Sequence, residues 1–192
     1  MDYMDPGRLK NFVDTKKQET SLTLPDIKEI ALSLASVVNY VHDKKYIIRN
    51  LMPDNIMLRK DGDRFKVKLT DLAYAVPFGS NDNLSDHPLF DWGDVPYTSP
   101  EALLGPTYNQ SMDIWSLGVL YYFMLTCSLP FYHEDDKTLV HTIKMAAYSY
   151  DIHCPVDHEA RDLIARMLRP DPVDRCSAKE ILKEPWLSHN KQ

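Results

Sequence analysis

One segment, residues 111–125, constrains the fold more than any other part of the chain. A helix drawn through it would carry apolar side chains on nearly every side, at Ile114, Trp115, Leu117, Val119, Leu120, Tyr121, Tyr122, Phe123, Met124 and Leu125. A helix that is hydrophobic all round is buried in a protein core or in a membrane. This run is shorter than the roughly 18 residues of a membrane span, and polar residues interrupt it. The sequence therefore predicts a central helix, capped by Ser111 and surrounded by other elements.

Amphipathic patterns predict further helices around this central one. Residues 25–42 repeat apolar side chains at helical spacing, after a capping box formed by Thr23 and Asp26. Similar patterns predict helices over residues 136–147 and from a cap at Asp157 to Leu168. A second capping box, Ser177 with Glu180, begins a last short helix.

The rest of the chain predicts little β-structure. Apolar residues at 56–58 and the alternation at 65–69 indicate short strands, joined by a turn that contains Asp61-Gly62. Residues 76–98 have the Gly, Pro, Asn and Ser content of a long loop. No repeat, low-complexity tract or linker divides the sequence. We therefore expect residues 1–192 to form one mainly α domain, a helical bundle with a small two-stranded β element.

Short motifs recur in a fixed order along almost the whole chain. Residues 48–55, I-R-N-L-M-P-D-N, resemble the H-R-D-L-x-x-x-N catalytic loop of protein kinases, and T-D-L-A at 70–73 resembles the D-F-G site. The resemblance continues with S-P-E at 99–101, D-I-W-S-L-G at 113–118, D-P-V-D-R at 171–175 and E-P-W-L at 184–187. The chain is thus similar to the C-terminal lobe of a Ser/Thr protein kinase, nearest the calcium/calmodulin-dependent group.

The resemblance implies an internal organisation. Residues 1–4 correspond to the hinge between kinase lobes, residues 48–55 to the catalytic loop, and residues 71–101 to the activation segment. The sequence contains neither a G-x-G-x-x-G loop nor a V-A-I-K lysine. We therefore expect the N-terminal lobe to be absent, either because the protein begins at the hinge or because the chain is a fragment.

Two catalytic positions of the resemblance are changed. Asn50 stands where the family has the Asp that accepts the substrate proton, and an amide has no basic lone pair. Loss of a general base typically costs about 10²–10⁴-fold in rate. Met52 replaces the Lys that neutralises the moving phosphate, and Asp94 replaces a Thr that contacts both groups. Asn50 and Met52 are therefore interpreted as degenerate catalytic positions.

Ligand-binding positions are partly retained. The resemblance makes Asn55 and Asp71 the two magnesium ligands and Met57 the floor of the adenine pocket. The favoured alternative is that Asn55 and Asp71 hydrogen-bond the loop backbone. Arg8 stands near the usual place of a ribose-binding acid, which argues against nucleotide. We expect no cofactor or metal, with weak Mg-ATP binding at these vestigial positions as the alternative.

Positions that support the fold are better kept. The resemblance implies a buried ion pair between Glu101 and Arg175, and makes Asp113 the group that holds the catalytic-loop backbone. Arg49 has two interpretations. It binds a phosphorylated activation segment, phosphorylated at Ser80, Ser85 or Thr98, or it pairs with an acid such as Asp82, Asp86 or Asp94. The second interpretation is favoured.

Composition excludes some partner classes. A net charge of −6 argues against nucleic acid or an anionic membrane as the main partner. The local basic segments, Lys44-Lys45 and residues 64–68, are interpreted as solvated faces. Three widely spaced cysteines form no metal pattern and are typical of a reducing compartment, and no signal peptide is recognised. The expected location is cytoplasmic or nuclear.

These observations lead to one functional hypothesis and two alternatives. The first is a catalytically inactive pseudokinase that acts as a scaffold or allosteric interaction module. Another protein would then cover the hinge and cleft surface around Met1, Met4, Met57 and Leu72. The first alternative is a fragment of a Ser/Thr protein kinase that transfers phosphate from ATP to protein. The second is a structural subunit of a large assembly.

Overall fold

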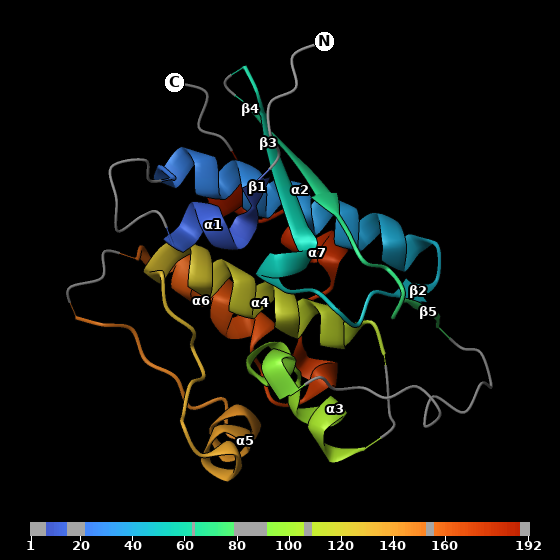
Figure 1. The fold of residues 1–192 in the computed structure, drawn as a ribbon, viewed down its shortest axis with the longest axis vertical. Coiled ribbons are helices and arrows are strands. Elements are labelled where there is room, and N and C mark those ends of the chain that lie inside the picture. The colour runs from blue at the N-terminus through green and yellow to red at the C-terminus, as the bar shows by residue number, and fades with distance from the viewer. Residues whose placement is uncertain are drawn as a thin grey trace.

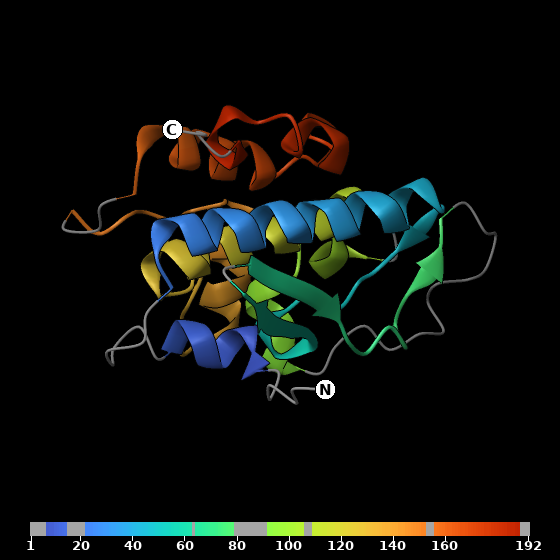
Figure 2. The ribbon, with the colours of Figure 1, turned by 90° about the horizontal axis from the view of Figure 1, so that it is seen from above.

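Two long helices, α2 (Leu24–Asp43) and α4 (Ser111–Thr126), pack against each other in the middle of the structure (Figure 1). Figure 2 shows the C-terminal helices α6 (His158–Met167) and α7 (Ala178–Ile181) on one side of α2, and α1 (Leu9–Asp14) with the main sheet on the other. The structure is a computed structural model. It describes residues 7–14, 22–62, 64–78, 92–105, 109–152 and 156–188.

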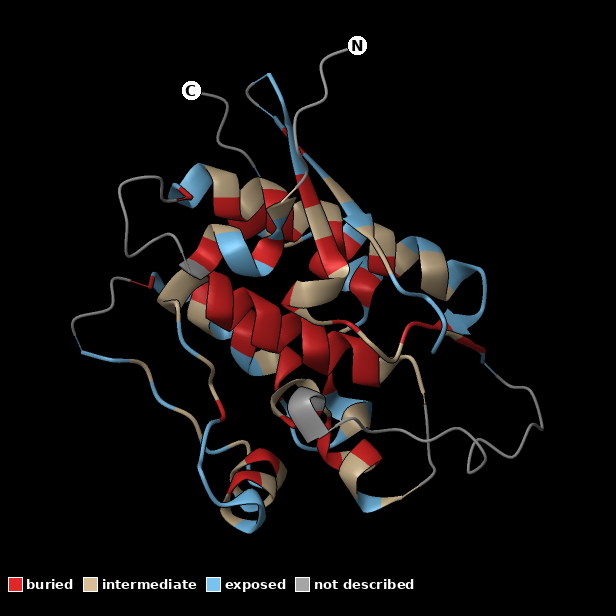
Figure 3. Cartoon of the chain, in the orientation of Figure 1, coloured by how far each residue is buried: buried red, intermediate tan, exposed pale blue. Residues whose placement is uncertain are grey.

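Helix α4 is the centre of the core. Every residue from Met112 to Met124 is buried, and the helix forms the continuous buried band in Figure 3. Trp115 stacks on Phe131 with ring centroids 5.3 Å apart, which extends the core beyond the helix. The expectation of a central, fully surrounded helix is confirmed, because an apolar surface on all sides can only be satisfied by packing on all sides.

The cap of this helix differs from the prediction. Gln110 occupies the N-cap position, and Ser111 is the first helical residue. The backbone N–H and the hydroxyl of Ser111 both donate to Asn109 Oδ1, over 2.8 Å and 2.6 Å. Asn109 therefore accepts the hydrogen bonds that close this end, and Ser111 is a donor in the first turn rather than the cap.

The other predicted helices are present. Thr23 caps α2, where Asp26 N donates to Thr23 Oγ1 and Thr23 N donates to Asp26 Oδ2. Asp157 caps α6, and the second capping box begins α7. Helix α5 (Asp136–Lys144) ends earlier than predicted, and α3 (Pro100–Leu104) is short. The described residues also form short 3-10 helices: η2 (Pro53–Asn55), η4 (Trp92–Tyr97), η5 (Pro172–Asp174) and η6 (Pro185–Leu187).

The β-structure is larger than the two-stranded element predicted. Strands β3 (Ile56–Asp61) and β4 (Arg64–Leu69) form the expected hairpin, and β1 (Gly7–Arg8) adds a third antiparallel strand in the order β1-β3-β4. A separate pair joins β2 (Tyr46–Ile47) to β5 (Val76–Pro77). The sequence missed β1, β2 and β5 because two residues are too few to show an alternating pattern.

Two predicted regions lie partly or wholly outside the described residues. The hinge-like residues 1–4 are not described, and residues 79–91 of the activation-segment-like region are not described either. The division of the chain into these regions stays a prediction. Within the described ranges, no helix combines the length and the apolar character that crossing a bilayer requires.

Gly118 gives a test of the central packing. A Cβ atom at this position would lie 2.9 Å from Met167 Cβ and 3.0 Å from Leu168 Cδ2. Helices α4 and α6 can therefore approach each other this closely only because residue 118 has no side chain. We expect Gly118→Val to lower the free energy of unfolding by about 1–3 kcal/mol through overpacking. Urea denaturation measures this loss. Gly105→Val is the matched control, since nothing lies within 4 Å of its Cβ position, and an equal loss in both variants would contradict the packing argument.

Candidate functional site

The candidate site is built around residues 48–55, the loop that connects β2 to β3. Asp113, in the first turn of α4, is 1% exposed and holds the start of this loop. Its Oδ2 accepts a hydrogen bond of 2.8 Å from Ile48 N, and its Oδ1 accepts one of 2.9 Å from Arg49 N. The carboxylate thus fixes two successive backbone groups of the loop, which is the contact that the sequence implied for Asp113.

His42 is a third partner of Asp113, and the sequence analysis gave it no role. Its Nε2 lies 2.8 Å from Asp113 Oδ2, and its side chain is 10% exposed. The His42 carbonyl oxygen in turn accepts a 2.8 Å hydrogen bond from Gln110 Nε2. These residues are far apart in the chain, so no local pattern could have indicated the contact.

Two residues of the candidate site have backbone conformations that cost free energy. Arg49 has φ = 68° and Asp71, after β4, has φ = 54°, both in the left-handed region. Such residues cost on the order of 1–3 kcal/mol each unless the surrounding structure holds them. At Arg49 the bond from its backbone N–H to Asp113 supplies part of that restraint. Strained backbone of this kind is concentrated at functional sites.

Two hydrogen bonds bring Asn50, Asn55 and Asp71 to one place. Asn55 Nδ2 donates to the carbonyl oxygen of Asn50 over 3.2 Å. Thr70 N, immediately before Asp71, donates to the carbonyl oxygen of Asn55 over 2.8 Å. The expected contact between Asn55 and the loop backbone is therefore present. The carboxylate of Asp71 is exposed and makes no hydrogen bond or ion pair with another described residue.

The donor set fits a magnesium ion that arrives with a nucleotide. The amide nitrogen of Asn55 is used in the loop, which leaves its oxygen as a ligand, and Asp71 offers a free carboxylate. Mg²⁺ is usually held by one or two carboxylates together with substrate phosphates and water. Among the described residues no cluster of three His, Cys, Asp or Glu side chains forms a protein-only metal site.

Among the described residues of β1 and α1, no basic side chain takes over the position of Met52. Met52 is partly buried at the start of η2, and its carbonyl oxygen accepts a hydrogen bond from Asn55 N. The nearest basic residues on β1 and α1 are Arg8 and Lys10, whose side chains lie 3.6 Å and 3.4 Å from the carboxylate of Asp54. These charges are directed to Asp54, so the loop presents a thioether where the family has a lysine.

A cavity of about 520 Å³ adjoins the loop on the hairpin β3–β4. Its lining includes Met57, the predicted floor of the adenine pocket, and Thr70, next to Asp71. Met57 is partly buried and lies opposite Arg8 of β1. The cavity is therefore suitably placed for a base, next to the residue that precedes Asp71.

The expected ion pair between Arg175 and Glu101 is present away from the loop. Arg175 Nη1 and Nη2 donate to the two carboxylate oxygens of Glu101 over 2.6 Å and 2.7 Å, and the Arg175 side chain is 0% exposed. Arg175 also donates to the carbonyl oxygens of Arg169, Pro170 and Ser111. This single guanidinium connects α3, the start of α4 and the turn after α6.

Several predicted contacts fall on residues that the structure does not describe. Met1, Met4 and the candidate partners or phosphorylation sites of Arg49 between residues 79 and 91 are among them, as is the side chain of Asp94. The two interpretations of Arg49 therefore stay predictions. Leu72 is described and is 50% exposed, and the covering of this surface by another protein stays a prediction.

Comparison with known proteins gives a consistent assignment. The sequence profile of the family described as "Protein kinase domain" matches residues 1–187. An Aurora kinase of Eremothecium gossypii is 36% identical over 160 residues, which are 82% of this chain and 41% of that protein. The probable serine/threonine-protein kinase MARK-A of Dictyostelium discoideum is 33% identical over 193 residues, 100% of this chain and 17% of that protein.

A third relative belongs to the group that the motifs resembled most. The delta subunit of calcium/calmodulin-dependent protein kinase type II from Oryctolagus cuniculus is 36% identical over 157 residues, 79% of this chain. The matched region makes up 28% of that protein. The chain thus spans less than half the length of each of these relatives.

These comparisons contradict the expectation of a catalytically inactive scaffold. The relatives are named as kinases, one of them as a probable serine/threonine-protein kinase, and they match this chain over most of its length. The physical reason for the error lies in the weight given to Asn50 and Met52. Phosphoryl transfer requires little covalent chemistry from the protein and depends chiefly on positioning and electrostatics. The contacts that position the loop are present in the structure.

Asp113 gives a test of how the loop is held. Asp113→Ala removes the acceptor of two backbone N–H groups and of His42. Each buried group left without a partner costs about 1–3 kcal/mol, so we expect the free energy of unfolding to fall by about 2–5 kcal/mol. Urea denaturation measures the loss, and faster amide hydrogen exchange at Ile48 and Arg49 locates it.

A surface carboxylate provides the control for this variant. Asp162 pairs with His158 on α6 and is 61% exposed. Asp162→Ala should change the free energy of unfolding by no more than about 0.5 kcal/mol. If the Asp113 variant is as stable as this control, the carboxylate does not hold the loop.

Proposed function

This chain belongs to the protein kinase family, and we propose that it forms the C-terminal lobe of a Ser/Thr protein kinase. Such a kinase transfers phosphate from ATP to protein hydroxyl groups. One observation carries the proposal. Residues 48–55 are fixed by Asp113 in a strained conformation that places Asn55 beside the residue preceding Asp71. Such an arrangement serves positioning, which is the main requirement of phosphoryl transfer.

Four residues have defined roles in this proposal. Asn55 and Asp71 hold the magnesium ion through one amide oxygen and one carboxylate. Bound Mg-ATP supplies the phosphate and the cation that neutralises it. Asn50, partly buried at the mouth of the loop, accepts a hydrogen bond from the substrate hydroxyl through its amide oxygen and so orients it. Met57 forms the apolar floor under the base.

The substitutions at Asn50 and Met52 lower the rate of phosphoryl transfer but do not change which reaction is catalysed. A hydroxyl oriented by an amide must lose its proton to water or to the phosphate, and a general base normally contributes about 10²–10⁴-fold. The missing lysine removes one electrostatic contact with the transferring phosphate. We propose a slow kinase, because alignment of the reactants by the loop and the metal site still lowers the activation free energy.

Further parts of the site come from outside the described structure. Neither a G-x-G-x-x-G loop nor a V-A-I-K lysine occurs in residues 1–192. We propose that another polypeptide, either a further segment or a partner protein, supplies the groups that cover the nucleotide. The same polypeptide would cover the cleft surface around Met57 and the exposed Leu72. The free cysteines Cys127 and Cys176 support a reducing location, cytoplasmic or nuclear.

Phosphotransfer by the natural polypeptide that contains residues 1–192 tests the proposal. We expect magnesium-dependent transfer of labelled γ-phosphate to Ser/Thr peptides. Because Asn50→Asp with Met52→Lys restores the base and the cation, this double variant should raise kcat by roughly 10²-fold or more. Asp71→Ala should abolish transfer, since it removes a metal ligand.

The outcomes separate a kinase from a contaminating activity. Transfer that persists in the Asp71 variant does not come from this site. Activity that appears only after the double substitution, or in no form of the protein, overturns the proposal. A thermal-shift titration with Mg-ATP provides an independent readout, in which the unmodified protein should be stabilised and the Asp71 variant should not.

A further inference from the structure

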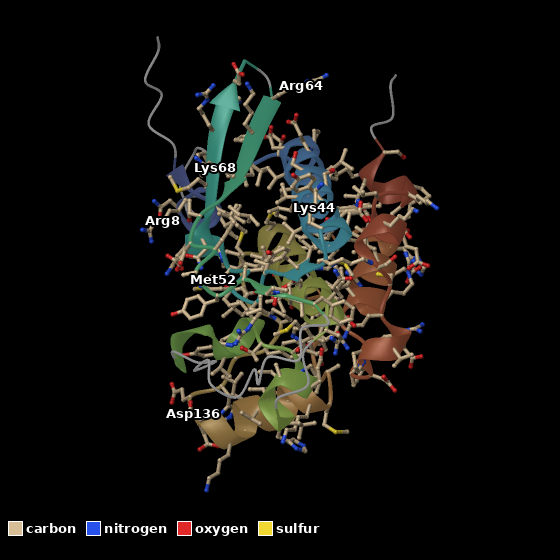
Figure 4. All side chains as sticks on the ribbon, turned by 90° about the vertical axis from the view of Figure 1, so that its right-hand side faces the viewer. Arg8, Lys44, Met52, Arg64, Lys68 and Asp136 are labelled. Atoms are coloured by element: carbon tan, nitrogen blue, oxygen red, sulfur yellow. The ribbon has the colours of Figure 1, made fainter. Side chains whose placement is uncertain are left out.

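One face of the three-stranded sheet gathers positive charge. Residues directly opposite each other in antiparallel strands lie on the same face. The register pairs Met57 with Lys68 and Arg59 with Lys66, and it places Arg64 opposite Asp61. Strand β1 adds Arg8 opposite Met57. We call this surface the cationic sheet face; its basic residues are Arg8, Arg59, Arg64, Lys66 and Lys68, of which Arg8, Arg64 and Lys68 are labelled in Figure 4.

Few acids balance these charges. Asp61 contacts Lys66 and lies 3.9 Å from Arg59, and its pKa is lowered chiefly by the hydrogen bond from Lys66. Lys68 and Arg64 make no ion pair or hydrogen bond with another residue in the part of the chain that is described. The sequence favoured a solvated face for residues 64–68. The register changes that interpretation, because it adds basic residues from two other strands to the same surface.

This arrangement costs stability. Arg59 and Lys66 are direct cross-strand neighbours, and like charges in such positions are destabilising. The whole chain has a net charge of −6, so a concentration of cations on one small sheet is not a consequence of composition. A surface that gathers like charges at some cost suits an anionic partner, which removes the repulsion on binding.

The same face is hollowed. The cavity of about 520 Å³ is lined by Met57, Arg59, Lys66, Lys68 and Thr70 from this face, with Leu58 behind them. A thioether therefore forms an apolar floor, and three cations and a hydroxyl form the rim. This chemistry accepts an apolar side chain that is flanked by carboxylates.

The phosphates of a nucleotide do not account for the outer cations. Lys66 precedes Asp71 by five residues, about 16 Å along an extended strand. A base above Met57 directs its phosphates toward the metal ligands Asn55 and Asp71. Arg59 and Lys66 lie in the opposite direction along the hairpin, so they remain available for a different ligand.

We propose that the cationic sheet face docks an acidic protein segment, with an apolar residue in the cavity and carboxylates on Arg59, Lys66 and Lys68. Rim charges of this kind act mainly through charge complementarity and association rate, and salt screens them. The apolar residue enters the cavity that we propose for the base, so the segment and the nucleotide exclude each other there, while Arg59 and Lys66 lie away from the loop and bind the segment whether or not the chain is a kinase.

A labelled peptide tests this surface directly. The probe is a fluorescein-labelled nonapeptide of Glu with a central Leu, and its binding is measured by fluorescence anisotropy at low and high salt. The test variant is Arg59→Glu with Lys68→Glu. It leaves the contact between Lys66 and Asp61 in place, and the new carboxylate at position 59 lies opposite Lys66, so the hairpin should remain folded. We expect this variant to weaken binding by about tenfold or more.

A matched variant controls for net charge. Lys137→Glu with Lys179→Glu makes the same change on exposed residues of α5 and α7 and should leave binding unchanged. A second measurement needs no substitution. Zero-length carbodiimide cross-linking of the Glu peptide to the unmodified chain should join it to Lys66 or Lys68.

The opposite results are equally defined. Equal weakening in both double variants, or cross-links spread over unrelated lysines, shows general attraction and overturns the proposal. So does equal binding of a nonapeptide in which Gln replaces every Glu. If single-stranded DNA or heparin displaces the peptide and binds more tightly, the face is a general polyanion surface and the acidic-segment proposal is wrong.

Discussion

The carboxylate of Asp113 is the contact on which the rest of the site depends. It lies at the start of the most buried helix, and from there it fixes Ile48 and Arg49 and contacts His42 at the end of α2. The two central helices are thereby joined to the loop of the candidate site. Because the packing of α4 determines where Asp113 lies, the geometry of this partly buried loop is set by the deepest part of the core.

The residues that stabilise the fold keep the family pattern, whereas two positions of the catalytic motif do not. The bidentate pair between Arg175 and Glu101 and the bonds of Asp113 keep the architecture, while Asn50 and Met52 depart from the family motif at two positions of the candidate site. The sequence alone suggests that the substitutions at Asn50 and Met52 abolish catalysis. That conclusion treated a general base as essential, whereas a loose transition state depends more on alignment and on the metal.

The sequence predicted those parts of the structure that local patterns determine. Capping boxes at Thr23 and Ser177 and the apolar surface of residues 111–125 located helices to within a few residues, because capping and burial act over one or a few turns. Contacts between distant residues were predicted only where the family resemblance supplied them, as for Arg175 and Glu101. The pairing of His42 with Asp113 and the two-residue strands have no local signature, so only the folded structure reveals them.

The sheet shows how one hairpin can serve two surfaces. Ile56, Leu58 and Phe65 lie on its inner face in the core, and this burial fixes the register. Once the register is fixed, Arg59 and Lys66 have no alternative but to face outward together, and Met57 and Thr70 must face the same way. The apolar core therefore determines both the floor of the cavity that we propose for the nucleotide and the row of cations beyond it. A slip of one residue would bury the charges and expose the core, so the positive face persists despite its internal repulsion.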